Sequence, residues 1–311
     1  MRRIVIDTDP GQDDAIALLL ALASPDELEV VAVTATAGNV PLALTTRNSL
    51  IVVELAGRSD VPVFAGASAP LLRDLVTAEH VHGKTGLDGP ALAEPNLTLA
   101  EGHAVDAILN AADQGRFTMC TLGPLTNLAM ALAARPSLAS SIDEIVMMGG
   151  GFSEGGNVTP AAEFNIYVDP HAADVVFTSG ISITMMPLDV THQVLASSSR
   201  IRRFDALNTD VGKVVADWLR FFDRYDSEKY GVDGAPLHDP CVIAYLLEPD
   251  LFGGRLCNVT VETGSELTMG MTVVDWWSVT DKPRNANVIR SVDADRFFDL
   301  LVERIGRVGT S

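Results

Sequence analysis

A strand, an acidic loop and a helix follow one another within the first 22 residues, and this order constrains the fold more than any other stretch. Residues 4–6 are β-branched, residues 7–14 read Asp-Thr-Asp-Pro-Gly-Gln-Asp-Asp, and residues 15–22 are apolar. This pattern predicts a short strand, a tight turn and a helix in direct succession. Ligands of an open α/β sheet bind at the carboxyl ends of its strands, so the acidic loop is a candidate site.

Strands and helices continue to alternate along the chain. Short apolar runs predict further strands at residues 28–34, 61–64, 117–121, 142–148 and 181–186. Helical patterns lie between them, at residues 12–24, 41–57 and 100–114, in a segment ending at 134, and from 169 onward. Alternation at these spacings is typical of a parallel sheet with right-handed crossovers. The predicted fold class is therefore α/β, with a mostly parallel central sheet, flanking helices and a Rossmann-like core.

The pattern changes after Pro187. Helices are predicted at residues 211–229, 240–247 and 293–305, and a hairpin at residues 257–262 and 271–275. Two long irregular stretches, residues 66–96 and 152–165, interrupt the alternation, and loops of such length usually serve binding. The sequence contains no internal repeat and no Ser/Gly-rich linker. We therefore expect a single domain over residues 1–311.

Composition limits the partners of this chain. Hydrophobic residues make up 47% of it and the net charge is −19, which indicates a globular protein that nucleic acid and acidic membranes would repel. A small neutral substrate remains compatible with that charge. No leader-like or membrane-length apolar run is visible, so we expect a cytoplasmic location. Cys120, Cys241 and Cys257 lack metal-site spacing and are expected to be buried free thiols.

Four carboxylates within eight residues repel one another unless a cation lies among them. Oxygen ligands on a loop suit Ca²⁺ or Mg²⁺, although a solvated acidic turn is the simpler alternative. Other polar residues follow later strands: Asn39, the segment 122–124 and the segment 157–165. All these strand ends lie at one edge of a parallel sheet, where the polar groups can converge. His238 and Asp239 add a titratable pair just before a predicted helix.

Each of these residues also has a purely structural interpretation when taken alone. Asn39 could be a turn residue, Asp239 a helix cap, His238 a surface histidine and Glu163 a solvated carboxylate. Their expected convergence at one sheet edge is what favours a functional site.

These motifs together resemble the inosine-uridine preferring nucleoside hydrolases. The resemblance rests first on Asp-Thr-Asp-Pro-Gly-Gln-Asp-Asp at residues 7–14 and extends over essentially the whole chain. Further matching segments are Ala-Gly-Asn at 37–39, His-Gly at 82–83, Leu-Gly-Pro-Leu-Thr-Asn at 122–127, Met-Gly-Gly at 148–150, residues 156–165 and Leu-His-Asp-Pro at 237–240. The resemblance implies hydrolysis of the N-glycosidic bond of ribonucleosides to ribose and free base.

The resemblance also implies roles for the acidic residues. Asp9, Asp14, Asp239 and the backbone carbonyl of Leu122 would hold one Ca²⁺, which would bind a water molecule and the ribose hydroxyls. Asp13 would accept the proton of that water as general base. Asp7 would support the loop through hydrogen bonds.

Substrate contacts are implied in the same way. The resemblance assigns ribose binding to polar and lining residues that come from three strand ends: Asn39, Met148, Asn157, Glu163, Phe164 and Asn165. His238 would serve the leaving base as general acid or hydrogen-bond donor, and His82 would be a second base contact. Pyrimidine-preferring relatives tend to carry Thr, Gln and Tyr at positions that here match Phe222, Asp226 and Tyr230. Of these three residues only the tyrosine is the same in this chain, so Tyr230 is an expected base contact.

Two other classes of function stay open at this point. A haloacid dehalogenase-type phosphatase also begins with a strand and Asp-x-Asp, but it needs a lysine at a strand end, which Lys84, Lys213, Lys229 and Lys282 do not provide. A non-catalytic Ca²⁺-binding protein would leave Asp13, Glu163 and His238 without a role. The family resemblance further implies a homodimer or homotetramer.

Overall fold

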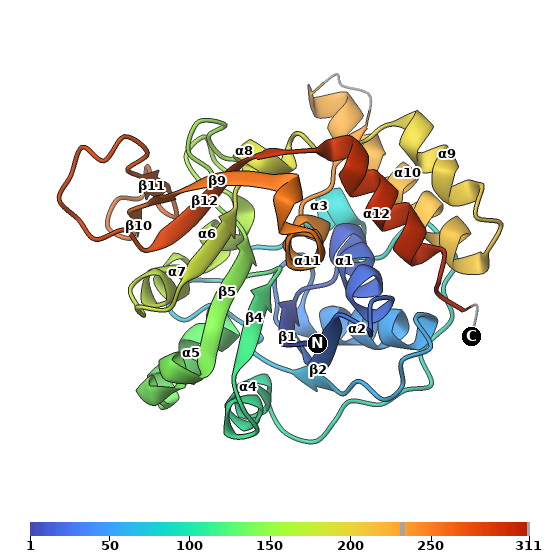
Figure 1. Cartoon of the computed structure of the whole chain (residues 1–311), viewed down its shortest axis with the longest axis horizontal. Coiled ribbons are helices and arrows are strands. Elements are labelled where there is room, and N and C mark those ends of the chain that lie inside the picture. The colour runs from blue at the N-terminus through green and yellow to red at the C-terminus, as the bar shows by residue number, and fades with distance from the viewer. Residues whose placement is uncertain (231–233, 310–311) are drawn as a thin grey trace.

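One twisted sheet forms the centre of the molecule (Figure 1). The computed structural model describes residues 1–230 and 234–309, without the side chains of residues 225–230. Within these residues eight strands pair in the order β3-β2-β1-β4-β5-β6-β12-β9. They are β1 (Arg2–Thr8), β2 (Leu28–Ala35), β3 (Val63–Ala65), β4 (Phe117–Thr121), β5 (Ile142–Met148), β6 (Ile183–Met186), β9 (Phe252–Cys257) and β12 (Ala286–Val292). All pairings are parallel except that of β12 with β9.

Helices cover both faces of this sheet (Figure 1). The period of two along β1 places Ile4 and Ile6 in one apolar cluster and Val5 in the other. The Ile4 cluster is formed with α1 (Gln12–Leu22), α2 (Leu42–Leu55), α10 (Asp210–Tyr230), α11 (Pro240–Leu247) and α12 (Ala294–Ile305). The Val5 cluster is formed with α4 (Ala104–Asp113), α5 (Thr126–Ala134) and α7 (Pro170–Phe177). Burial on both faces explains why the central strands are nearly continuous apolar runs.

Shorter elements connect these strands and helices. They are α3 (Glu79–His82), α6 (Phe164–Val168), α8 (Leu188–Thr191), β7 (Leu195–Ala196), α9 (Ser198–Asp205), β8 (Ala235–Pro236), β10 (Val259–Val261), β11 (Thr272–Val274) and two 3₁₀ turns, Pro136–Ser141 and Pro249–Leu251. The pairs β7–β8 and β10–β11 are separate antiparallel ladders, and the second projects from the body of the molecule (Figure 1).

The predicted fold class is confirmed, with corrections in the last third of the chain. The stretch expected to form a single strand at 257–262 is divided, because Cys257 ends β9 and β10 begins at Val259. Strand β12, which joins the main sheet between β6 and β9, was not predicted, and neither was α9. Among the helices of the described residues, none is long and apolar enough to cross a membrane.

Candidate active site

The loops at the carboxyl edge of the sheet surround one pocket, and most of the predicted site residues line it. These are Asp13, Asn39, His82, Leu122, Met148, Asn157, Glu163, Phe164, Asn165, His238 and Asp239. Asp9 and Asp14 are fully buried and do not line the pocket. The side chain of Tyr230, the predicted base contact, lies outside the described residues. The expected convergence of distant segments at this edge is therefore observed.

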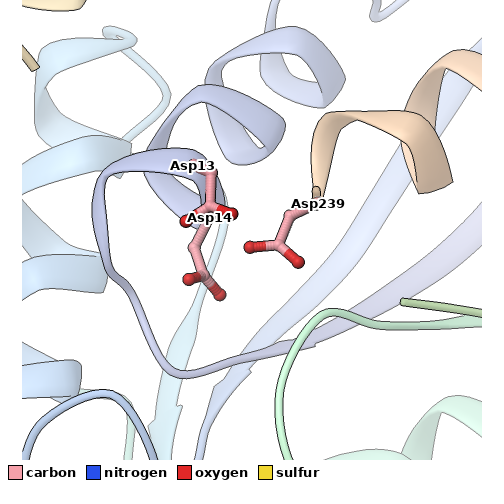
Figure 2. A group of neighbouring side chains, drawn as sticks. All are labelled: Asp13, Asp14 and Asp239. Carbon is pink, nitrogen blue, oxygen red and sulfur yellow. The ribbon is translucent and has the colours of Figure 1, made fainter. Parts of the chain in front are cut away.

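Three carboxylates from two helices meet at this pocket. Asp13 and Asp14 belong to the first turn of α1, and Asp239 immediately precedes Pro240 at the start of α11. One oxygen of each lies within 4.8 Å of an oxygen of the other two, and Figure 2 shows Asp239 directed toward Asp13 and Asp14. All three residues are buried, so the alternative of a solvated acidic turn is wrong.

Hydrogen bonds hold the acidic loop in this conformation. Asp14 accepts from the Thr8 hydroxyl at 2.6 Å through Oδ1 and from the Gly11 amide at 3.0 Å through Oδ2. Asp9 Oδ2 accepts from the amide of Asn39 at 2.7 Å. Below the loop, Asp7 Oδ1 accepts from Thr34 and Asn127 at 2.6 and 2.8 Å, which fits its expected supporting role.

Burial without a counter-charge raises the pKa values of these carboxyl groups strongly. Desolvation, followed by repulsion from Asp14, raises the pKa of Asp13 from 3.8 to about 7. Desolvation likewise raises the pKa values of Asp9 and Asp239 well above the ordinary range, with neighbouring carboxylates adding to the effect. A cation among these groups would offset both the desolvation and the mutual repulsion, because it would coordinate the carboxylates and neutralise their charge.

The residues present fit a hard cation. Asp9 Oδ1 and Asp13 Oδ1 are buried without a hydrogen-bond partner among the described residues, so each has an unused lone pair. The donors are all oxygens, as Ca²⁺ and Mg²⁺ require. The Leu122 carbonyl accepts a 2.6 Å hydrogen bond from Asn165 and keeps a second lone pair. The cluster of three nevertheless contains Asp13, where the predicted ligand set had Asp9.

Asp9 is enclosed by two glycine-containing loops. A Cβ atom added at Gly38 would lie 2.1 Å from Asp9 Oδ2, and one added at Gly123 would lie 2.2 Å from Asp9 Oδ1. Neither position can therefore carry a side chain while Asp9 keeps this place. The glycines of both predicted motifs are thus explained by the close approach of their backbone to one carboxylate.

Glu163 joins two elements of the pocket wall. Its Oε2 accepts from the amides of Gly150 and Ile166 at 2.9 and 3.2 Å, and its Oε1 accepts from the amide of Asn165 at 2.9 Å. Only 2% of the residue is exposed, so the alternative of a solvated carboxylate is wrong. Desolvation raises its pKa from 4.5 to about 7, opposed by the backbone donors. Glu163 therefore caps α6 and ties it to the end of β5.

Amides also link the strand ends. Asn39 Nδ2 donates to Asp14 Oδ2 at 3.0 Å and to the Asp9 carbonyl at 3.2 Å. Asn165 Nδ2 donates to the carbonyls of Leu122 and Met148 at 2.6 and 3.3 Å. The turn interpretation of Asn39 is thus insufficient, because its side chain bonds to the acidic loop.

Histidines and one phenylalanine form another part of the pocket wall. His82 Nδ1 lies 2.8 Å from Gln12 Oε1, and the ring stacks on Phe222 with centroids 5.4 Å apart. Phe222 meets His238 edge-on at 6.5 Å, and His192 lies 5.9 Å from His238. Desolvation lowers the pKa values of His82 and His238 to about 3, so both rings are neutral at neutral pH.

Sequence reasoning missed several participants in this wall. Gln12 fixes His82 from 70 residues away, and His192 lines the pocket. In the sequence Phe222 is a mismatch to a pyrimidine motif, yet in the structure it contacts both predicted histidines. No local pattern marks these pairs, since each joins segments distant in sequence. The three cysteines are buried and free, as predicted.

Known ribonucleoside hydrolases are similar to this chain over nearly its whole length. The structure aligns over 99% of both chains with the purine-preferring ribonucleoside hydrolase from Gardnerella vaginalis, at a TM-score of 0.92 and 32% identity. The sequence is 51% identical over 307 residues to the pyrimidine-specific ribonucleoside hydrolase RihA of Photobacterium profundum, covering 98% of each protein. It is 56% identical over 309 residues to an uncharacterized protein of Schizosaccharomyces pombe, covering 98% of this chain and 99% of that protein.

Residues 4–299 match the sequence model of the inosine-uridine preferring nucleoside hydrolases. The chain belongs to this family and is a nucleoside N-ribohydrolase. Family membership decides against the phosphatase and the non-catalytic Ca²⁺-binding protein. The acidic cluster is the group of described residues that could hold the metal on which such an enzyme depends.

Proposed function

We propose that this enzyme is a Ca²⁺-dependent ribonucleoside hydrolase in which Asp13 is the general base and His238 serves the leaving base. The observation that carries the proposal is the position of Asp13. It lines the pocket, has one oxygen without a partner among the described residues, and lies beside Asp14 and Asp239. Asp9 and Asp14 lie behind it, out of the pocket lining.

Asp9, Asp14, Asp239 and the Leu122 carbonyl would hold the cation. When bound, it would neutralise the carboxylates and orient oxygen ligands of the substrate. The all-oxygen donor set and the unpaired Asp9 oxygen support this assignment. Asp7 supports the loop from below through its bonds to Thr34 and Asn127.

The reaction then follows the geometry of an inverting glycosidase. The oxygen of water attacks C1′, its proton passes to Asp13, and the C1′–N bond breaks with its electron pair moving to the base. Positive charge that develops on the ribose ring faces the acidic wall of the pocket. Asn39, Asn157, Glu163 and Asn165 would orient the ribose, while Met148 and Phe164 would pack against it. His82 and Tyr230 are proposed base contacts.

His238 would stabilise the departing base by hydrogen bonding. Its ring is neutral at neutral pH, so a ring N–H can donate without the cost of a buried charge. Phe222 packs edge-on against His238 and stacks on His82, so apolar carbon covers one side of the ring.

We further propose a preference for pyrimidine ribonucleosides. The named pyrimidine-specific relative is 51% identical to this chain, whereas the structural neighbour named as purine-preferring is 32% identical. A homodimer or homotetramer and a cytoplasmic location are proposed on the family resemblance alone, and light scattering and cell fractionation would test them.

The decisive experiment measures free ribose from uridine, cytidine, inosine and guanosine, with and without a calcium chelator. We expect Asp13→Asn to lower kcat by at least about a hundredfold, the scale of general-base catalysis, and the exposed Asp26→Asn to leave it unchanged. Chelation should abolish activity, and Ca²⁺ should restore it. Ribose release that persists in Asp13→Asn would refute the base assignment, and a higher kcat/KM for inosine than for uridine would refute the pyrimidine preference.

A further inference from the structure

We infer that Thr191 is a positioning residue for the hydrolysis: it fixes the tautomer of His238 and so aims a ring N–H at the leaving base. Thr191 ends α8, is fully buried and does not line the pocket. Its Oγ1 lies 2.8 Å from Nδ1 of His238, 47 residues further along the chain. The inference rests on the proposed role of His238.

A short antiparallel ladder brings the two residues together. Leu195 pairs with Pro236 in β7 and β8, and the amide of Leu237 donates to the Val194 carbonyl at 2.9 Å. This pairing places the segment between α8 and β7 next to the segment that follows β8. Thr191, at the end of α8, therefore lies beside His238, which follows Leu237. Backbone pairing, which does not depend on substrate, therefore sets the distance between the hydroxyl and the ring.

The surroundings of the hydroxyl decide the direction of this hydrogen bond. If Nδ1 carried the proton, the hydroxyl would accept it and its own hydrogen would need a second acceptor. Among the described residues, the ring nitrogen is the acceptor that the structure shows within hydrogen-bond distance of Thr191 Oγ1. A buried hydroxyl seldom leaves its hydrogen unused, so Thr191 donates to Nδ1. The ring proton then lies on Nε2.

The tautomer decides what His238 can offer the substrate, because the hydrogen bond from Thr191 already occupies Nδ1. Nε2 is the ring nitrogen left to act on substrate, and with its proton it can donate to an atom of the base that gains electrons as the C1′–N bond breaks. The hydrogen bond strengthens as that charge develops, and no proton has to leave the ring. The opposite tautomer would present a lone pair to the departing base and repel it.

The experiment compares Thr191→Val, which keeps the shape of the side chain, with Thr191→Ser, which keeps the hydroxyl. Thr184→Val is the matched control, because it also removes a buried hydroxyl, bonded to Glu144 at 2.6 Å, away from the pocket lining. Substrates are uridine and p-nitrophenyl β-D-ribofuranoside, whose activated leaving group needs no donor. We expect Thr191→Val to lower kcat on uridine about five- to tenfold, the loss of one oriented hydrogen bond, with less than about a twofold change on the activated substrate.

Thr191→Ser should recover most of the uridine activity, and Thr184→Val should match the unmodified enzyme. In a His238→Ala background, Thr191→Val should cost nothing further, because a residue that acts through His238 cannot act without it. Long-range ¹H–¹⁵N spectra should place the ring proton of His238 on Nε2 in the unmodified enzyme and show a mixture of tautomers in Thr191→Val.

The outcomes separate this inference from the proposed function. An unmodified enzyme that releases no ribose from any nucleoside would refute the proposed function. With an active enzyme, equal losses on both substrates, a further loss in the His238→Ala background, or a proton on Nδ1 would each overturn the role of Thr191 alone.

Discussion

Glu163→Ala is expected to destabilise the protein and to weaken nucleoside binding together. The carboxylate accepts three buried backbone hydrogen bonds, two at the start of α6 and one from Gly150 at the end of β5. A buried amide left without an acceptor costs about 1–3 kcal/mol, and water entering the vacated space would satisfy part of the set, so we expect a loss of roughly 3 kcal/mol. For a chain of 311 residues this corresponds to a fall in Tm of about 5 °C.

Thermal unfolding followed by circular dichroism would measure this fall, with the exposed Glu266→Ala as the control. Glu163→Gln keeps one acceptor oxygen and should lose about half as much stability. Because α6 carries Phe164 and Asn165 into the pocket, KM for uridine should rise in Glu163→Ala more than kcat falls. A Tm within about 1 °C of the unmodified protein would refute the view that this carboxylate holds the pocket wall together.

Two further predictions concern the acidic loop. Gly38→Ala places a Cβ 2.1 Å from Asp9 Oδ2, so the stabilisation that Ca²⁺ gives in a thermal melt should fall sharply. Gly264→Ala is the control, because its added Cβ has one neighbour at 3.4 Å, and it should behave as the unmodified protein. An unchanged calcium response in Gly38→Ala would contradict the packing argument. In metal-free protein, burial raises the pKa values of Asp7, Asp13 and Glu163 to about 7, so the stability they contribute is complete below their ordinary values and is lost as pH rises through 7. We therefore expect a lower Tm at pH 8 than at pH 6 after chelation, and Ca²⁺ should remove the part of that difference that comes from Asp13, which belongs to the acidic cluster. A chelated protein with a higher Tm at pH 8 would show that the sign is wrong.

The parallel half of the fold was predictable because its signal is local. Strands β1, β2, β4, β5 and β6 are mostly buried apolar runs, and burial on both faces leaves the same pattern wherever such a strand occurs. Strand β9 has no such pattern, since it reads Phe-Gly-Gly-Arg-Leu-Cys and most of it is exposed. Glycine weakens a strand signal, and an edge strand needs only one covered face. Pairing with β12 defines β9, and pairing is invisible in the sequence of one segment.

The site was predictable to the level of motifs, but the partners of each side chain were not. Gln12 and His82, or Thr191 and His238, meet through tertiary contacts that no spacing encodes. Asp9 shows the same limit: its motif predicts a ligand of the cation, but the hydrogen bond that its carboxylate accepts from the amide of Asn39 could not be read from the sequence.

The hydrogen bonds inside the protein also decide what the pocket can offer a ribose. Asn39 and Asn165 both direct Nδ2 into the protein, toward a carboxylate or carbonyl oxygens, and these acceptors fix the orientation of each amide. A sugar bound as proposed would therefore meet the Oδ1 atoms, which accept hydrogen bonds. Hydroxyl groups can donate to such atoms, whereas a deoxygenated carbon would leave a buried acceptor without a partner. The preference for ribose would thus arise from contacts that hold the strand ends together, before any substrate binds.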